Sequence, residues 1–408
     1  MRCWLVFLAA CSPAVADDPP RPSPEAAGLS AAVLGKIDGT VSRAIEAGTV
    51  PGAVVVVGRR GKIGHAGAYG RRAVVPAAEP MTRDTIFDLA SLTKPLATAT
   101  SIMILVERGK LRLDDRLGAL LPDFDNRGKG SITVEQLLRH RSGLIADNPM
   151  GDFADGPDAA WARIARLGLV GVPGEKLVYS DVGYMILGRV VEKVSGQDLD
   201  EFSRREIFLP LGMLDTGFKP AHAERIAPTE PADGAMLRGT VHDPRARGLG
   251  GVAGHAGLFG TADDLALYAR MMLEGGVGRD GRRILAASTI RAMIDPGNTP
   301  ARQRRGLGWD VDTPQSTPRG RLFGPGGFGH TGFTGTSLWV DPTSSAFVVV
   351  LTSRLHPDGK APSPTALRAD VATLAAEAVI EISARHDDPR PALPGTEQSP
   401  PRASPRGP

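Results

Sequence analysis

Ser91 and Lys94 stand three positions apart and form the one S-x-x-K pattern in this chain. A serine hydroxyl becomes a useful nucleophile only when a neighbouring base removes its proton. On a helix, residues at i and i+3 lie on one face, so these two side chains can form a hydrogen bond. A lysine that loses its charge on burial can act as the base. The pair therefore predicts acyl transfer through a covalent serine intermediate.

Two further patterns follow along the chain, and each occurs once. Residues 179–181 read Tyr-Ser-Asp, ahead of a helix that is expected to start near Gly183. Residues 330–333 read His-Thr-Gly-Phe and lie in a β-rich stretch. Tyr179 supplies a phenol that can carry a proton. Asp181 has two interpretations, a substrate contact or the N-cap of the following helix.

The three patterns, in this order, resemble the serine penicillin-recognising enzymes. This family comprises class C β-lactamases, D-alanyl-D-alanine carboxypeptidases and related esterases, and its motifs are S-x-x-K, Y-x-N and K-T-G. The resemblance covers about residues 28–384, and it extends to the L-L-R-H-R-S-G-L run at 137–144. Residues 241–259 look like the carboxypeptidase branch that includes penicillin-binding protein 4B.

The resemblance implies a role for each matching residue. Ser91 would be acylated, and Lys94 and Tyr179 would jointly move its proton. The main-chain amides of Ser91 and Phe333 would form the oxyanion hole. The remaining matched residues would bind substrate, and these are Asp181, His330, Thr331, Gly332 and Phe333. No cofactor is implied.

The second and third motifs depart from the family pattern. Asp181 stands where asparagine is usual, and His330 stands where lysine is usual; both departures weigh against β-lactamase activity. A histidine with an ordinary pKa is charged only part of the time near neutral pH. We therefore expect preference for substrates that carry a carboxylate to rise as pH falls, with Asp181 raising the pKa of His330 or burial lowering it.

The elements that must position these residues come from both ends of the chain. A helix is expected over 31–47, then a hairpin of two strands at 52–58 and 63–69, then a helix from Ser91 to about Arg108. Thr133 with Gln136, and Thr261 with Asp264, predict capping boxes. Strands are expected near 306–312, 327–331, 337–340 and 346–352, and a last helix over about 365–384.

This order predicts an α+β fold in which both ends of the chain build one antiparallel sheet flanked by helices, with a mostly helical subdomain inserted. The resemblance makes the fold β-lactamase/transpeptidase-like. We expect a signal peptide at 1–16, a linker at 17–27, the hydrolase domain at 28–384 and a disordered tail at 385–408.

The first residues predict export to the periplasm or cell envelope. An apolar run at 4–10 is too short to span a bilayer. Ala14-Val15-Ala16 is a cleavage site for ordinary secretion, whereas the run 8–11 resembles a lipobox that would leave Cys11 anchored to the membrane by lipid. Cys3 and Cys11 are the two cysteines, so the domain has no disulfide and no thiolate metal site.

Composition and charge narrow the range of expected partners and ligands. The formal net charge is +3 over 408 residues, with no long basic run, which excludes nucleic acid as an expected partner. His242, Asp243 and His255 could ligate a metal, but their spacing matches no known metal motif, and we expect a structural role. Residues 324–329 match G-x-G-x-x-G but precede a strand, so we interpret them as a turn.

These features predict an exported serine hydrolase that acts on a peptidoglycan stem peptide or another small acyl donor. Two alternatives stay open: an esterase of small acyl esters, and a non-catalytic peptidoglycan-binding module.

Overall fold

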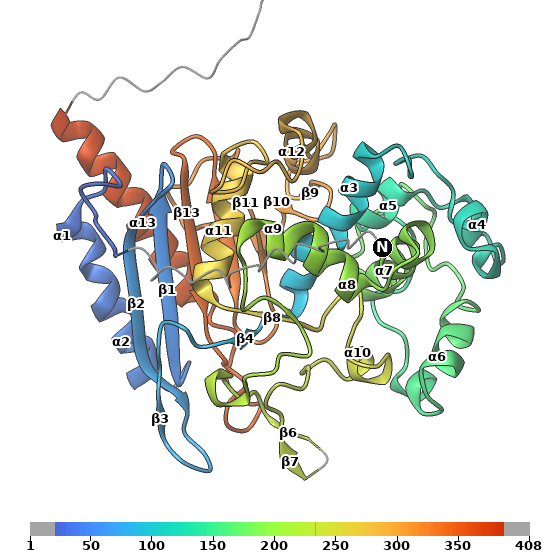
Figure 1. The fold of residues 1–408 in the computed structure, drawn as a ribbon, viewed down its shortest axis with the longest axis horizontal. Coiled ribbons are helices and arrows are strands. Elements are labelled where there is room, and N and C mark those ends of the chain that lie inside the picture. The colour runs from blue at the N-terminus through green and yellow to red at the C-terminus, as the bar shows by residue number, and fades with distance from the viewer. Residues whose placement is uncertain (1–20, 233, 387–408) are drawn as a thin grey trace, which may run out of the picture.

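An eight-stranded antiparallel sheet forms the centre of the protein. The computed structural model describes residues 21–232 and 234–386, and the sheet order is β3-β2-β1-β13-β12-β11-β10-β9 (Figure 1). The strands are β1 (Gly52–Arg59), β2 (Lys62–Ala73), β3 (Glu79–Pro80), β9 (Arg304–Arg305), β10 (Asp310–Asp312), β11 (Phe328–Thr331), β12 (Ser337–Asp341) and β13 (Ala346–Leu351).

The two ends of the chain meet in the middle of this sheet. β1 pairs with β13 from Val54 opposite Leu351 to Arg59 opposite Ala346. The β1–β2 hairpin turns through Arg60 and Gly61, both with positive φ, as a tight two-residue hairpin loop requires. The predicted α+β fold with one antiparallel sheet is therefore confirmed.

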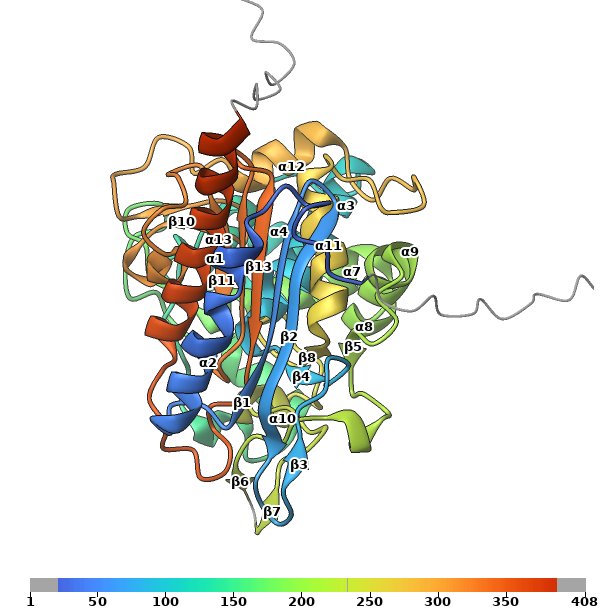
Figure 2. The same cartoon turned by 90° about the vertical axis from the view of Figure 1, so that its left-hand side faces the viewer.

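Both faces of β1 are covered, so the whole strand is buried. Alternate residues point to opposite faces: Val55 and Val57 join one apolar cluster, and Val54 and Val56 join the other. Figure 2 shows α1 (Ala31–Leu34), α2 (Lys36–Glu46) and α13 (Thr365–His386) on the first face, and α11 (Ala262–Leu273) on the second. The sheet thus separates two cores.

A mostly helical region lies beyond the second face, as predicted. It includes a small three-stranded sheet in the order β4-β8-β5. Its elements are β4 (Phe87–Asp88), α3 (Thr100–Glu107), α4 (Leu117–Leu120), α5 (Val134–Leu138), α6 (Pro157–Ile164), α7 (Asp181–Ser195), α8 (Leu199–Ser203), α9 (Leu209–Leu211), β5 (Gly217–Phe218), β6 (Pro231–Ala232), β7 (Ala235–Met236), α10 (Pro244–Gly248), β8 (Leu258–Gly260) and α12 (Ala287–Ile294).

Several boundaries differ from the sequence predictions. The predicted linker at 17–27 enters the fold before its end, because Ser23 N donates to Ile63 O and Ala27 is buried. The strand expected over 306–312 is two short strands, β9 and β10, joined by a turn in which Gly306 N donates to Trp309 O. α13 continues to His386, two residues into the predicted tail.

The predicted export signal lies outside the described residues, as does the tail from residue 387 onward. Within the described ranges, every helix is too short or too polar to cross a bilayer.

One of the two predicted capping boxes is complete. Thr133 Oγ1 accepts from Gln136 N, and Gln136 Oε1 accepts from Thr133 N. Thr261 caps α11, but the Asp264 carboxylate bonds Asp215 N and Thr216 Oγ1 instead of returning to Thr261. Asp264 thus forms hydrogen bonds with residues distant in the sequence instead of with the N-cap of its own helix.

Replacing Thr133 with alanine should lower the free energy of unfolding by about 1 kcal/mol, because the Gln136 amide at the start of α5 loses its partner. Urea unfolding with a fitted midpoint measures the change. Thr133→Ser keeps the hydroxyl and should stay close to the wild type; an equal loss in both variants would show that packing of the threonine methyl, not the cap, stabilises this turn.

Candidate active site

Ser91 lies in a short 3-10 turn, Ala90–Leu92, between β4 and the π-helical segment Lys94–Ala99 that runs into α3. Ala90 has φ of 47°, a left-handed conformation that costs free energy in any residue with a Cβ. Asp88 holds this turn: Oδ1 accepts from Ala90 N at 2.8 Å and Oδ2 accepts from His242 N at 2.6 Å. Complete burial raises the pKa of Asp88. The strained turn fixes the start of the segment that carries Ser91.

Lys94 is fully buried and its ammonium is surrounded by three oxygen atoms. Nζ donates to Ser91 Oγ at 2.9 Å and to His255 O at 3.0 Å. Asp181 Oδ1 lies 2.7 Å from Nζ, and at this distance the opposite charges form an ion pair. Burial by itself would lower the pKa of Lys94, yet the interactions with Asp181 and Tyr179 outweigh it and raise the pKa.

Tyr179 is held beside Lys94 by ring contacts. Its ring centroid lies 4.3 Å from that of His140, in a stacked arrangement, and 4.9 Å from Lys94 Nζ. His140 Nδ1 accepts from Ser180 N at 2.9 Å, so its imidazole fixes the backbone next to Tyr179 as well. Burial, and the charge of Arg305, lower the pKa of His140 well below its usual value. His140 belongs to the 137–144 run quoted above, although the sequence assigned it no role.

Asp181 is the first residue of α7, and the cap of this helix is Ser180, whose Oγ accepts from Gly183 N. Of the two interpretations of Asp181, the helix cap is therefore wrong. Its carboxylate instead pairs with Lys94.

His330 is on β11 and is buried, which changes what it can do. Nδ1 donates to Thr331 O at 2.9 Å, and Nε2 has no partner among the described residues. Burial lowers the pKa of His330 well below its usual value, and the positive charges of Arg305 and Lys94 lower it further. The imidazole is thus neutral around pH 7, and the pH dependence that we expected from a partly charged His330 is not supported.

The loop after β11 is fixed from several sides. Gly332 N donates to Thr336 O at 2.7 Å, and Arg368 of α13 donates to the carbonyls of Gly332 and Gly335. A Cβ on Gly332 would lie 2.5 Å from the backbone oxygen of Leu89, so glycine is required. The Phe333 ring is 60% exposed and stacks on His242, with centroids 5.4 Å apart. Sequence-distant residues thus set the position of residues 331–333.

Arg305 is a site residue that the sequence analysis missed. It sits on β9, is 3% exposed, and its guanidinium carbon lies 5.4 Å from the Tyr179 ring centroid. Nε and Nη2 are buried and have no hydrogen-bond partner among the residues that the structure describes. No short motif marks Arg305, and the one available signal was its place in the β-rich third of the chain.

Of the three residues considered for a metal, two come together and one does not. His255 Nε2 lies 3.0 Å from Asp243 Oδ1, and together with Asp181 they offer ligand atoms within 4.8 Å of one another. His242 pairs with Glu230 instead, at 2.6 Å. The Lys94 ammonium already balances Asp181 at this position, which favours a structural arrangement over a metal site.

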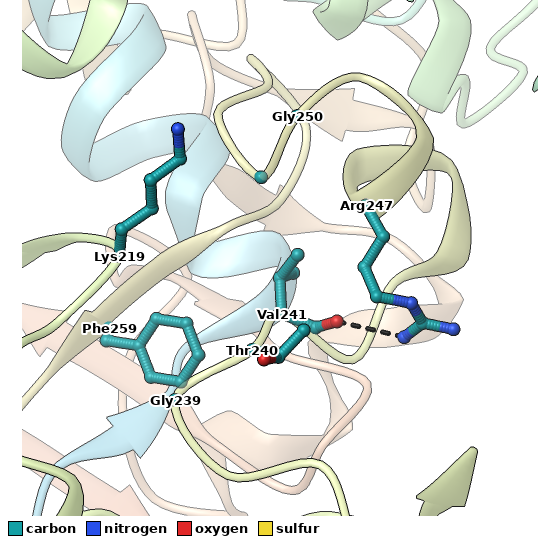
Figure 3. A pocket seen from close by; sticks show the side chains of 8 residues that line it. Lys219, Gly239, Thr240, Val241, Arg247, Gly250 and Phe259 are labelled. Atoms are coloured by element: carbon teal, nitrogen blue, oxygen red, sulfur yellow. Dashed lines mark hydrogen bonds between the residues drawn. The ribbon is translucent and has the colours of Figure 1, made fainter. Parts of the chain in front are cut away.

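A cavity of about 410 Å³ lies next to this region. Figure 3 shows Lys219 and Arg247 at its sides, Phe259 and Val241 at its base, and a hydrogen bond from Arg247 to Val241 O (Figure 3). Gly250 and Gly251 belong to its wall, so part of the glycine-rich 248–260 segment lines it. Ser91, Lys94 and Tyr179 do not line this cavity. The reacting groups therefore lie outside it, around Ser91.

The sequence model of the Beta-lactamase family matches residues 37–373. The protein belongs to this family. A protein of Escherichia coli K12 named "Putative D-alanyl-D-alanine carboxypeptidase" is 33% identical over 86% of this chain and 90% of its own length. An "N-acetylmuramyl-L-alanine amidase" of Bacillus subtilis is 34% identical over 81% of this chain and 83% of its own length.

Solved structures agree on the fold. EstCE1, "a hydrolase with promiscuous acyltransferase activity", superposes with a TM-score of 0.66 at 26% identity, over 84% of this chain and 98% of its own. A penicillin-binding protein homologue from Caulobacter crescentus gives 0.67 at 21% identity, over 86% and 98%. This Beta-lactamase family member is a hydrolase with the β-lactamase/transpeptidase-like fold, so the binding-module alternative is set aside.

Proposed function

We propose that this Beta-lactamase family hydrolase is a D-alanyl-D-alanine carboxypeptidase-like enzyme that forms an acyl-enzyme on Ser91. The observation that carries the proposal is Arg305, a buried cation with unpaired N–H groups beside Tyr179. A buried charge without a counter-charge is costly, and a guanidinium is well suited to bind a carboxylate through two parallel hydrogen bonds. The C-terminal carboxylate of a stem peptide would supply the missing counter-charge.

The proposed reaction follows from the contacts around Ser91. Ser91 Oγ attacks the carbonyl carbon of the terminal peptide bond while its proton passes to the Lys94–Tyr179 group. The amides of Ser91 and Phe333 stabilise the oxyanion. The proton is then delivered to the leaving D-alanine nitrogen, and water hydrolyses the ester. Arg305, with Thr331, would hold the carboxylate of the leaving residue, a task that a neutral His330 cannot perform by charge.

The names of the relatives support this branch and leave one close rival. The Escherichia coli relative favours the carboxypeptidase branch that the 241–259 stretch suggested. The Bacillus subtilis relative is named for cleavage next to L-alanine, a bond that bears no adjacent free carboxylate. Arg305 favours the carboxypeptidase over the amidase, because only the former substrate places a carboxylate beside the scissile bond.

An esterase is the second candidate. EstCE1, at 26% identity, is a hydrolase that transfers acyl groups, and the absence of the family lysine at His330 removes one cation that esters do not need.

Export, through either a cleaved signal or a lipid-anchored Cys11, is part of the proposal, since stem peptides lie outside the cytoplasmic membrane.

Arg305→Gln is expected to reduce kcat/KM for a D-Ala-D-Ala peptide on the order of 100-fold, because the loss of hydrogen bonds to a charged partner costs roughly 1.5–3 kcal/mol. The same peptide as its methyl ester should change by no more than a few-fold. In the wild type, the ratio of the two kcat/KM values should stay flat from about pH 5 to about pH 8, because arginine keeps its charge throughout. Release of D-alanine from the free acid and of D-alanine methyl ester from the ester, each followed by mass spectrometry, measures the two rates.

Arg304→Gln, the neighbouring position on β9, is the matched control and should leave the ratio unchanged. Equal losses on acid and ester in Arg305→Gln would mean that Arg305 does not recognise the carboxylate. Ester turnover without D-alanine release in the wild type would move the assignment to the esterase.

A further inference from the structure

The Lys94 ammonium nitrogen lies within 3.0 Å of three oxygen atoms. These are Ser91 Oγ at 2.9 Å, His255 O at 3.0 Å and Asp181 Oδ1 at 2.7 Å. An ammonium has three donors and no lone pair. Lys94 therefore has to lose one proton before it can accept the proton of the Ser91 hydroxyl.

Only one of the three oxygens can store that proton. A backbone carbonyl does not hold a proton, and Ser91 is itself the group that must be deprotonated. Asp181 is a carboxylate, whereas the asparagine usual at this motif position is an amide that takes up no proton. The departure from the family motif thus adds a proton acceptor in direct contact with the lysine.

We propose that Lys94 and Asp181 act as one proton-exchanging pair, in which Asp181 takes a proton from the Lys94 ammonium and so frees Lys94 to accept the proton of Ser91. The Lys94 N–H bond breaks and an Asp181 O–H bond forms. The Ser91 proton then moves to the Lys94 lone pair as Oγ bonds to the acyl carbon. When the leaving group departs, Lys94 gives a proton to it and regains its own from Asp181.

Burial makes this exchange feasible. Moving one proton within the pair turns two charges into two neutral groups, and the complete burial of Lys94 favours the neutral forms. No proton enters from or leaves to solvent, so the exchange needs no change of pH. Asp181 contacts Lys94 and acts through it, so its role in this exchange is that of a positioning residue.

The neighbouring carboxylates favour a proton on Asp181. Burial and the charge of Asp181 raise the pKa of Asp147, which shows repulsion between the two carboxylates, and Asp243 lies within the same cluster. A proton on Asp181 relieves this repulsion. The titratable and charged groups that face the pair are Tyr179, Tyr184, His140, His330, Arg305, Asp147, Asp243 and His255.

The proposal rests on acylation of Ser91 but not on the D-Ala-D-Ala substrate, and the test separates the two. kcat/KM for p-nitrophenyl acetate is measured from about pH 6 to about pH 9.5 on the full chain, with the Ser91→Ala rate subtracted. This leaving group departs without a proton, so the profile reports removal of the serine proton. The profile therefore tests the Lys94–Asp181 exchange even if the protein does not release D-alanine.

The wild type should give a flat profile from about pH 6.5 to about pH 9. Asp181→Asn should be about 10- to 100-fold slower at pH 7, within the usual range for lost acid–base catalysis, and should recover as pH rises and Lys94 loses its proton to water. Asp198→Asn, a carboxylate at the start of α8, is the matched control and should keep the wild-type profile.

The opposite result overturns the proposal. If Asp181 merely holds Lys94 in its charged form, the wild-type rate rises about tenfold per pH unit between pH 7 and pH 9, and Asp181→Asn is faster than the wild type at pH 7. The wild-type profile alone decides this point, even where the variant fails to fold.

Discussion

Replacing Ser91 with alanine is expected to lower hydrolysis of every substrate by a factor on the order of 10⁴ or more, because loss of the nucleophile removes the covalent route entirely. The fold should survive. Ser91 caps no helix, and the variant loses one hydrogen bond while Lys94 keeps His255 O and Asp181, a change of about 1–2 kcal/mol.

Intact-mass measurement after brief exposure to an active ester or a penicillin checks the covalent step. The wild type should gain one acyl mass, and Ser91→Ala should gain none. Ser101→Ala is the matched control: Ser101 is buried on α3 and its hydroxyl has no partner among the described residues, so this variant should acylate normally. Turnover by Ser91→Ala at the wild-type rate would contradict the proposed mechanism.

Lys94→Ala and Tyr179→Phe should each reduce kcat/KM by about 10³-fold, and the double variant should be only slightly slower than the slower single variant. Nζ lies 4.9 Å from the Tyr179 ring centroid, and groups that move one proton as a unit give strongly non-additive losses. Once either member is missing, the other has no proton to pass on.

Tyr184→Phe serves as the control for this pair. Tyr184 lies on α7 and donates to Leu138 O at 2.9 Å, so its loss should reduce stability by about 1 kcal/mol and leave the rate per folded molecule nearly unchanged. Strictly multiplicative losses in Lys94→Ala with Tyr179→Phe would show instead that the two residues act in separate steps.

The nucleophilic centre could be predicted from the sequence because its geometry is local. Three positions of helical chain bring Lys94 to Ser91, and the 2.9 Å contact follows from the spacing without any tertiary information. The β1–β2 hairpin, the complete capping box at Thr133 and the last helix, α13, are equally local features. The incomplete box at Thr261 shows the limit of such rules, because the nearby Asp215 and Thr216 offered Asp264 a better partner.

The charge state of each side chain was beyond the sequence, because burial depends on which elements pack together. His330 could have been partly charged or neutral. The folded chain buries it beside Arg305 and Lys94, and that lowers its pKa. Asp181 could have capped a helix or met a substrate. The approach of α7 to the segment after Ser91 sets its carboxylate on Lys94 instead.

The sequence by itself determined the order of motifs, the α+β architecture and the family to which the protein is similar, since these depend on residue type, spacing and periodicity. Only the tertiary structure revealed Arg305. Its two-residue strand carries no recognisable pattern, and its meaning comes from the 5.4 Å approach to Tyr179 and from the lack of a counter-charge among the described residues. Motifs record which groups are present, whereas the cost of burying an unpaired charge exists only after folding has excluded water.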